Sequence, residues 1–311
     1  MNWIAVALSA YLLLAVANLL DKFLVDNVLK NSRAYAFAAC LLGVMVLLAS
    51  PWFLRWPGWP LFAFNIVNGF IFAFALWMLY EALRRGEAAR VLVFIGGVTP
   101  IFSLLFSLLF FKEHFTVNQW LGMLFILIGV VIIIFLPIAR SYLARIFKEL
   151  KLTQNIKSGS LGIALLSALA YSVYFLSTKQ AYSSQPFVSA FIWTRLGAAL
   201  FVLIFLIKRA DRQAIMTFWR KSGPNKNKFL VVFNQILGAS GFILQNYAIY
   251  LGSVVLVNAL QGAQYAFLLI ISAILALNAP RLLKEIFSWK IFLRKAAAVV
   301  AVIIGLYFIT F

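Results

Sequence analysis

Acidic residues, histidine and cysteine are scarce in this 311-residue sequence, which has eight Asp and Glu residues, one histidine (His114) and one cysteine (Cys40). A single cysteine excludes an intrachain disulfide. So few carboxylates leave little for metal binding or acid–base catalysis, and the sequence has neither a Ser/His/Asp set nor a GxxxxGK(S/T) nucleotide motif. We therefore expect no enzyme activity, no cofactor and no direct use of ATP.

Charged residues of both signs make up only 11% of the chain, whereas apolar residues make up 65% and the mean hydropathy is +1.00. Soluble domains are roughly 45–50% apolar and about 25% charged. A water-soluble fold of this length has too little interior to hide so much hydrocarbon. The composition therefore indicates a polytopic membrane protein.

Ten apolar runs are long enough to cross the hydrocarbon layer as helices, which takes about 20 residues each. The runs are continuously apolar and lack the alternation of a membrane β-barrel. We predict an all-α polytopic protein with ten transmembrane helices, at residues 3–20, 34–54, 61–83, 88–111, 117–138, 161–178, 187–207, 229–250, 253–277 and 291–311.

Lys and Arg outnumber Asp and Glu by 27 to eight. Because these residues fall in short gaps between apolar runs, they indicate anionic lipids as partners rather than nucleic acid. The connections after the odd-numbered spans carry 23 of the 27, so the positive-inside rule predicts both termini outside a bacterial-type cytoplasmic membrane. Apolar stripes at 143–150 and 282–287 favour helices lying on the membrane surface, with solvated loops as the alternative.

The two halves of the chain repeat each other in the same order. Lys22, Asn68, Gly86 and Lys112-Glu113 correspond to Lys179, Asn234, Gly252 and Lys284-Glu285. Each half holds five spans, an odd number, so the second half must be inserted upside down. We predict two inverted five-helix repeats, 1–138 and 159–311, joined by a basic interfacial linker at 139–158. Such inverted repeats are typical of transporters that bind substrate near the midplane.

Short motifs in the first half make a more specific pattern: Gly86-Glu87-Ala88-Ala89, Thr99-Pro100, Glu113 with Thr116, and Gly122 with Gly129. In this pattern the chain resembles the EamA-like transporters of the drug/metabolite transporter superfamily. The resemblance implies a transporter, and members of that superfamily move amino acids, sugars, nucleotide sugars and other metabolites. Those proteins usually have both termini inside, whereas the charge bias of this chain favours termini outside.

Arg195 lies near the middle of the seventh predicted span, with no carboxylate on the same span. A charge at that depth costs at least roughly 2.5–3.5 kcal/mol, so it needs a partner inside the bundle. Arg195 either receives a substrate carboxylate or phosphate in a planar fork, or it is a structural residue bonded to helix carbonyls or to a tyrosine such as Tyr174.

Polar side chains at membrane depth cannot face lipid cheaply, so we expect them to line a central cavity. Bonding between helices is the alternative for any single amide. The predicted substrate-binding residues are Arg195, Trp193, Gln245, Asn258, Gln261, Gln264 and Tyr265, faced by Asn68, Trp77 and Tyr80. We predict that Asp21, Glu81 and Glu87, which lie at span ends beside basic residues, form salt bridges that hold loops.

These observations favour a secondary active transporter of a small polar metabolite bearing a carboxylate or phosphate, working by alternating access around a midplane site. A flippase for a lipid-linked head group is the alternative if the cavity opens sideways to lipid. A non-transporting membrane scaffold also fits the composition, but it explains neither the repeat nor Arg195.

Overall fold

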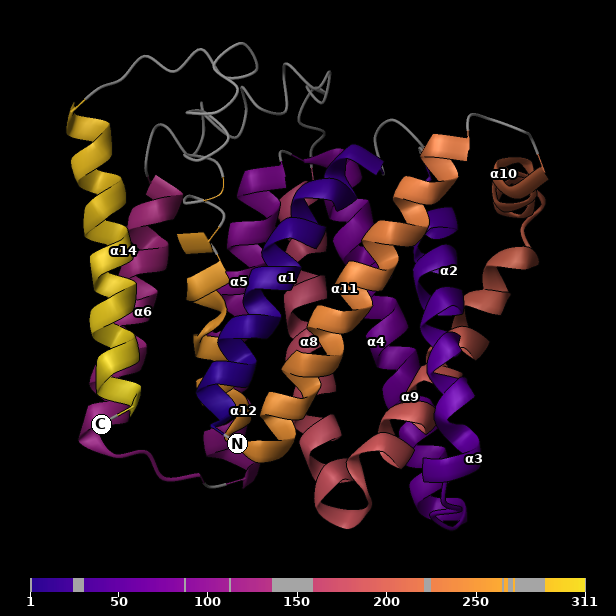
Figure 1. The fold of residues 1–311 in the computed structure, drawn as a ribbon, viewed down its shortest axis with the longest axis horizontal. Helices are drawn as coiled ribbons and strands as arrows, with labels where there is room; N and C mark the ends of the chain where they lie inside the picture. Colours follow the sequence, from indigo (N-terminus) through magenta and orange to yellow (C-terminus); the bar gives the residue numbers. More distant parts are fainter. Residues whose placement is uncertain are drawn as a thin grey trace.

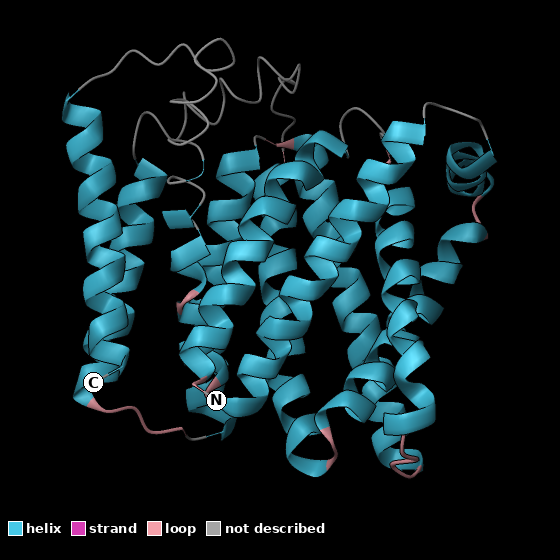
Figure 2. Ribbon diagram, viewed as in Figure 1, coloured by secondary structure: helices cyan, strands magenta, loops and turns pink. Residues whose placement is uncertain are grey.

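The computed structural model describes residues 2–24, 31–86, 88–111, 113–135, 159–220, 225–264, 266–267, 271 and 289–310. The regular structure of these ranges is entirely helical (Figure 2). The predicted linker at 139–158, the stripes at 143–150 and 282–287, and the residues Glu87 and Tyr265 lie outside the described residues.

Within the described ranges the helices follow the predicted spans in order, and a further helix, α10, lies in a basic connection. They are α1 (Trp3–Phe23), α2 (Ser32–Gly43) continued by η2 (Val44–Ala49) and α3 (Ser50–Phe53), α4 (Trp59–Arg85), α5 (Ala88–Phe106) continued by η3 (Ser107–Phe111), α6 (Val117–Phe135), α8 (Ser160–Ser184), α9 (Phe187–Leu203) continued by η5 (Ile204–Leu206), α10 (Arg209–Arg220), α11 (Asn225–Leu251), α12 (Val254–Ala259) and α14 (Trp289–Thr310).

Five of the described helical segments are long and apolar enough to cross a membrane. They are Ser32–Phe53, Trp59–Arg85, Ser160–Ser184, Phe187–Leu206 and Lys228–Leu251. Shorter apolar helices lie at Trp3–Asn18, Phe94–Phe110, Val117–Gly129 and Val300–Ile309. The ninth predicted span begins as α12, and after it only residues 260–264, 266–267 and 271 of that span are described, so the count of ten spans stays a prediction.

Polar residues just before the apolar runs fix where several helices begin. The Asn31 side chain accepts hydrogen bonds from the backbone N–H groups of Arg33 and Ala34 and so caps α2. At the start of α6, the backbone N–H of Thr116 donates to Gln119, and the backbone N–H of Gln119 donates to the Thr116 hydroxyl. This reciprocal pair is a capping box, and it explains why α6 starts directly after Thr116.

The helices stand side by side in one bundle (Figure 1). α4 packs against α8 and α9, α1 packs against α11, and α5 packs against α8. α6 and α14 form a pair at one edge of the bundle. α1 begins and α14 ends at the same end of the bundle, while α10 lies at the opposite end.

Two helix pairs approach so closely that only glycine fits between them. A methyl group on Gly69 of α4 would lie 2.2 Å from the backbone oxygen of Thr194, and one on Gly197 of α9 would lie 2.5 Å from the backbone oxygen of Ile66. Gly122 of α6 and Gly305 of α14 face each other's backbone in the same way. Small residues at these positions let the helix backbones touch, which is a common means of association in membranes.

Candidate functional site

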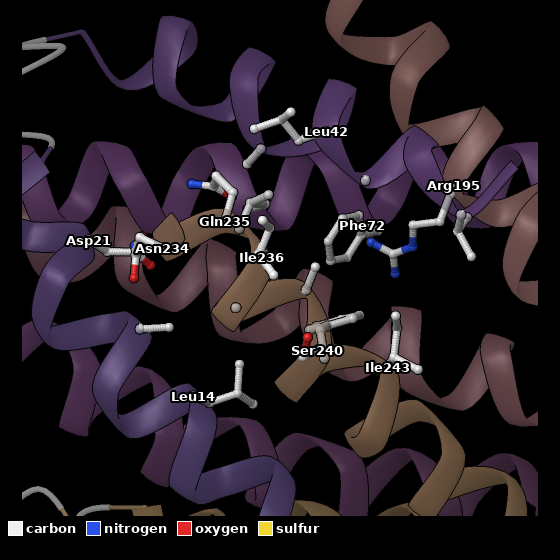
Figure 3. Close-up of a pocket in the computed structure, with 18 of the residues that line it drawn as sticks. Leu14, Asp21, Leu42, Phe72, Arg195, Asn234, Gln235, Ile236, Ser240 and Ile243 are labelled. Atoms are coloured by element: carbon white, nitrogen blue, oxygen red, sulfur yellow. The ribbon is translucent and has the colours of Figure 1, made fainter. Parts of the chain in front are cut away.

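A cavity of about 480 Å³ lies within the bundle, lined by α1, α2 with η2, α4, α8, α9 and α11. This volume is within the roughly 300–1,000 Å³ usual for small-molecule sites. The walls are mainly aliphatic and aromatic, and the two charged side chains among the lining residues stand at opposite ends, with Arg195 at one and Asp21 at the other (Figure 3). The cavity is therefore an apolar chamber with a cation, Arg195, at one end and a carboxyl group, Asp21, at the other.

The Arg195 side chain on α9 is 6% exposed and sits in a cage of aromatic rings. Its guanidinium carbon lies 3.8 Å from the ring centroid of Phe72, 4.6 Å from that of Phe191 and 4.8 Å from that of Phe242. One terminal guanidinium nitrogen donates a hydrogen bond of 2.9 Å to the hydroxyl of Tyr174. The rings stabilise the cation through their electron-rich faces, each by about 0.5–2 kcal/mol.

Arg195 retains unused hydrogen-bonding capacity in this cage. Its Nε is buried and has no hydrogen-bond partner among the described residues. The ion pairs in the described ranges join Arg33 to Asp211 and Glu81 to Arg84 and Arg85, so none of them neutralises Arg195. A buried guanidinium without a carboxylate can accept an anion that offers two oxygens to its planar fork.

Asp21 on α1 forms the other end of the cavity. Its carboxylate accepts hydrogen bonds from the hydroxyl of Tyr35, at 2.5 Å, and from the side-chain amide of Asn234, at 2.7 Å. Asn234 Oδ1 and Gln235 Nε2 nearby are buried and have no partner among the described residues. The expectation that Asp21 serves a loop salt bridge overlooked this polar group, which joins α1, α2 and α11.

Glu81, by contrast, forms the ion pairs that its position predicts. Its carboxylate binds Arg84 at 2.6 Å and Arg85 at 2.5 Å, and it accepts a hydrogen bond from the hydroxyl of Ser32. These contacts tie the end of α4 to the start of α2 at the basic end of the bundle.

The structure divides the predicted polar ring among several places. Arg195 and Tyr80 line the large cavity. Gln245, Gln261 and Gln264 line a smaller one of about 70 Å³, which shares Leu14, Asn18, Leu79, Tyr171 and Phe242 with the large cavity. Gln245, Gln261 and Gln264 therefore lie next to the main chamber rather than in its walls.

Two of the predicted residues make hydrogen bonds between helices. Asn68 donates to the hydroxyl of Thr178 at 2.8 Å, and Asn258 donates to the hydroxyl of Ser103 at 2.9 Å. Both asparagines are fully buried, and neither lines the large cavity. Their contacts match the alternative in which amides join helices.

The two predicted tryptophans point away from the chamber. The indole N–H of Trp193 donates to the backbone oxygen of Arg55, and its ring packs on Trp56. Trp77 lies in a separate polar pocket near the ends of α2 and α4, where its ring faces the guanidinium of Arg33 at 5.0 Å. Neither residue contributes to the large cavity.

The fold as a whole matches a solved structure titled "Crystal structure of protein". The TM-score is 0.63, and the match covers 98% of this chain and 96% of the other at 17% sequence identity. This likeness concerns the fold alone.

The sequence comparisons name a family for the first half. Residues 1–135 match the EamA-like transporter family, which confirms the resemblance over that region. A curated relative, "Uncharacterized transporter YdfC" of Bacillus subtilis (strain 168), is 33% identical over 141 residues, and this alignment covers 44% of the chain and 40% of the relative. Both matches support a membrane transporter rather than an enzyme.

Proposed function

We propose that this protein is a secondary membrane transporter that binds a solute carrying a carboxylate or phosphate at Arg195 and moves it by alternating access. The observation that carries the proposal is the state of Arg195, which is buried, caged by three rings and without an acidic partner among the described residues. Charges at membrane depth are costly and are typically retained where substrates or ions pass.

The proposed architecture is two inverted five-helix repeats, at 1–138 and 159–311, joined by a linker at 139–158. A pair of repeat-related hydrogen bonds supports it. Asn234 of α11 donates to Asp21 of α1, and Asn68 of α4 donates to Thr178 of α8. The two donors correspond under the repeat, and so do the two acceptors, because Asp21 and Lys22 align with Thr178 and Lys179.

A repeat-related pair of glycine contacts supports the same architecture. A methyl group on Gly252 would meet the ring of Trp3 at the start of α1, and one on Gly86 would meet the side chain of Ser160 at the start of α8. The glycines correspond to each other, and so do the residues that they contact. Each half therefore ends one helix against the first helix of the opposite half.

The repeat relates two interfaces between helices, which we call seams: α4 with α9, and α11 with α2. The two seams are packed differently, which supports alternating access. The seam between α4 and α9 is closed by the backbone contact of Gly69 with Gly197. Its counterpart between α11 and α2 encloses part of the large cavity instead. Two equivalent seams in unequal states are what a carrier needs if it opens one while it closes the other.

We also propose that both termini lie outside the cytoplasmic membrane. The charge bias supports this orientation, and the basic helix α10 lies at the end of the bundle opposite to both termini (Figure 1). In a Cys40→Ala background, a cysteine at Arg55 should react with an impermeant thiol reagent in intact cells, whereas one at Ser222 should react only after lysis. Reaction of position 222 in intact cells would reverse the orientation.

The function is tested on purified protein by ligand-induced thermal shifts with organic acids, amino acids, sugar phosphates and nucleotide sugars, followed by uptake of the hits into proteoliposomes. Arg195→Lys keeps the charge but loses the planar fork, so it should weaken the stabilisation by the anionic hit. Arg195→Gln should weaken it further. Arg55→Gln, which changes an exposed arginine, is the control and should behave as the parent.

Two results would contradict the proposal. If Arg195→Lys melts as the parent does and is stabilised equally by the same ligand, Arg195 does not receive the anion. If both Arg195 variants only lower the melting temperature while ligand affinity is unchanged, Arg195 is a structural partner of Tyr174.

A further inference from the structure

The large cavity reaches the lipid-facing surface of the bundle. Met45 of η2 and Ile236 of α11 both line the cavity, and each is 57% exposed. Met45 lies near the middle of the span Ser32–Phe53, and Ile236 lies well inside the span Lys228–Leu251. At that depth an exposed residue contacts hydrocarbon rather than water, so this opening connects the chamber with the bilayer.

Small residues line the cavity on the two helices that flank this opening. They are Ala39 and Gly43 on α2, and Gly238 and Ala239 on α11. A methyl group on Gly238 would meet only the Cβ of Ala17, at 3.6 Å, so side-chain space remains beside it. Next to the opening the α-helix of α2 gives way to the 3-10 turn of η2, a local change that often marks a hinge.

The unequal ends of the cavity give a bound molecule one orientation. A negative group is attracted to Arg195, whose Nε is unpartnered, and the far end, at Asp21, offers no cation among its lining residues (Figure 3). Between these ends the walls consist mainly of Leu14, Leu42, Leu76, Leu79, Ile236 and Phe242. Such walls offer few hydrogen bonds, so they penalise hydroxyl-rich molecules and favour aliphatic ones.

We infer that the ligand is an amphiphile with one oxyanion head group, which enters from the bilayer between η2 and α11 and places its head at Arg195 and its apolar body along the chamber. The inference rests on the proposed function in one respect, because it treats the bound molecule as the molecule that is transported. It replaces the wholly polar metabolite with a molecule that is polar at one end. The head is a carboxylate or a phosphate monoester, since both fit the guanidinium fork.

The test is photolabelling of the purified full-length protein in lipid nanodiscs. The probes are palmitate and hexadecyl phosphate, each with a diazirine in its chain, and the labelled residues are mapped by mass spectrometry. We expect labels on the residues of η2 and α11 that line the cavity, and lower labelling in Arg195→Gln. The probe that labels the cavity more strongly shows whether the head group is a carboxylate or a phosphate.

Variants of the opening separate entry into the chamber from contact with the outer surface. Gly238→Leu places a larger side chain in the cavity wall of α11, beside the opening, and should reduce cavity labelling by roughly tenfold or more. Gly162→Leu is the matched control, because Gly162 faces open space and lies outside the cavity, and it should label as the parent does. If Gly238→Leu does not fold, Ala239→Leu, at an exposed position that lines the cavity on α11, takes its place.

Equal cavity labelling in the parent and in the folded opening variant would overturn the inference, and so would labels confined to the outer surface. Stabilisation by succinate or glycerol phosphate, combined with no cavity labelling by either amphiphile, would also overturn it while leaving the proposed transporter intact. Cavity labelling that depends on Arg195, without transfer of the probe across proteoliposome membranes, would support the inference and remove the proposed transport.

Discussion

Gly69→Ala adds one methyl group where the backbones of α4 and α9 approach each other closely. The new Cβ would lie 2.2 Å from the backbone oxygen of Thr194 and 2.6 Å from the backbone nitrogen of Ala198. Because the obstacles are backbone atoms, no side-chain rotation relieves the clash, and α4 and α9 must move apart by about an ångström. Overpacking of this kind costs typically about 1–3 kcal/mol.

The greater helix propensity of alanine offsets about 0.5–1 kcal/mol of that cost. We therefore expect Gly69→Ala to lower the free energy of unfolding by about 1–2 kcal/mol. Thermal unfolding can be followed with a thiol-reactive dye, since the only cysteine, Cys40, is buried in the folded protein. Gly162→Ala, which meets open space, is the control and should melt at or slightly above the parent temperature. A Gly69→Ala protein as stable as its parent would refute the closed contact.

Lys179→Met should lower the melting temperature, because the Lys179 ammonium donates to the backbone oxygens of Ile249, Tyr250 and Gly252 at the end of α11. Lys208→Met, at an exposed lysine, should change the melting temperature little, and equal effects of the two substitutions would exclude the cap. Tyr174→Phe removes the hydroxyl that binds Arg195 and should cost about 1 kcal/mol of stability while changing anion affinity. Trp193→Phe should leave ligand affinity unchanged, and a clear loss of affinity would mean that Trp193 contributes to ligand binding.

Most of the helices could be predicted because each crossing of a bilayer needs about 20 apolar residues, and apolar runs of that length can be found directly in the sequence. The run predicted to start at residue 187 begins α9 at Phe187, and the run at 88 begins α5 at Ala88. The helix ends were less predictable. α8 was predicted to end at 178 but continues to Ser184, since polar residues can extend a helix beyond the hydrocarbon.

The site was predicted only in part, because depth in the membrane does not fix the direction of a side chain. Trp193 is two positions from Arg195, which is about 200° around a helix, so the two side chains could not face the same chamber. Helix geometry alone was therefore enough to exclude Trp193 from the site. Asp21 was missed because Lys22 follows it on the chain and suggested a salt bridge, whereas its hydrogen-bonding partner Asn234 comes from α11, more than 200 residues away.

The aromatic cage of Arg195 has a consequence for the half of a transport cycle in which nothing is carried. After releasing an anion, a carrier must return with a naked guanidinium in a medium that solvates ions poorly. Phe72, Phe191 and Phe242 travel with the protein, so their ring faces solvate the cation whether or not a ligand is present. They do so without offering a fixed negative charge that would compete with the cargo. In the transport cycle that we propose, the rings would thus be a permanent, neutral substitute for the departed anion, and they would lower the barrier of the unloaded return step.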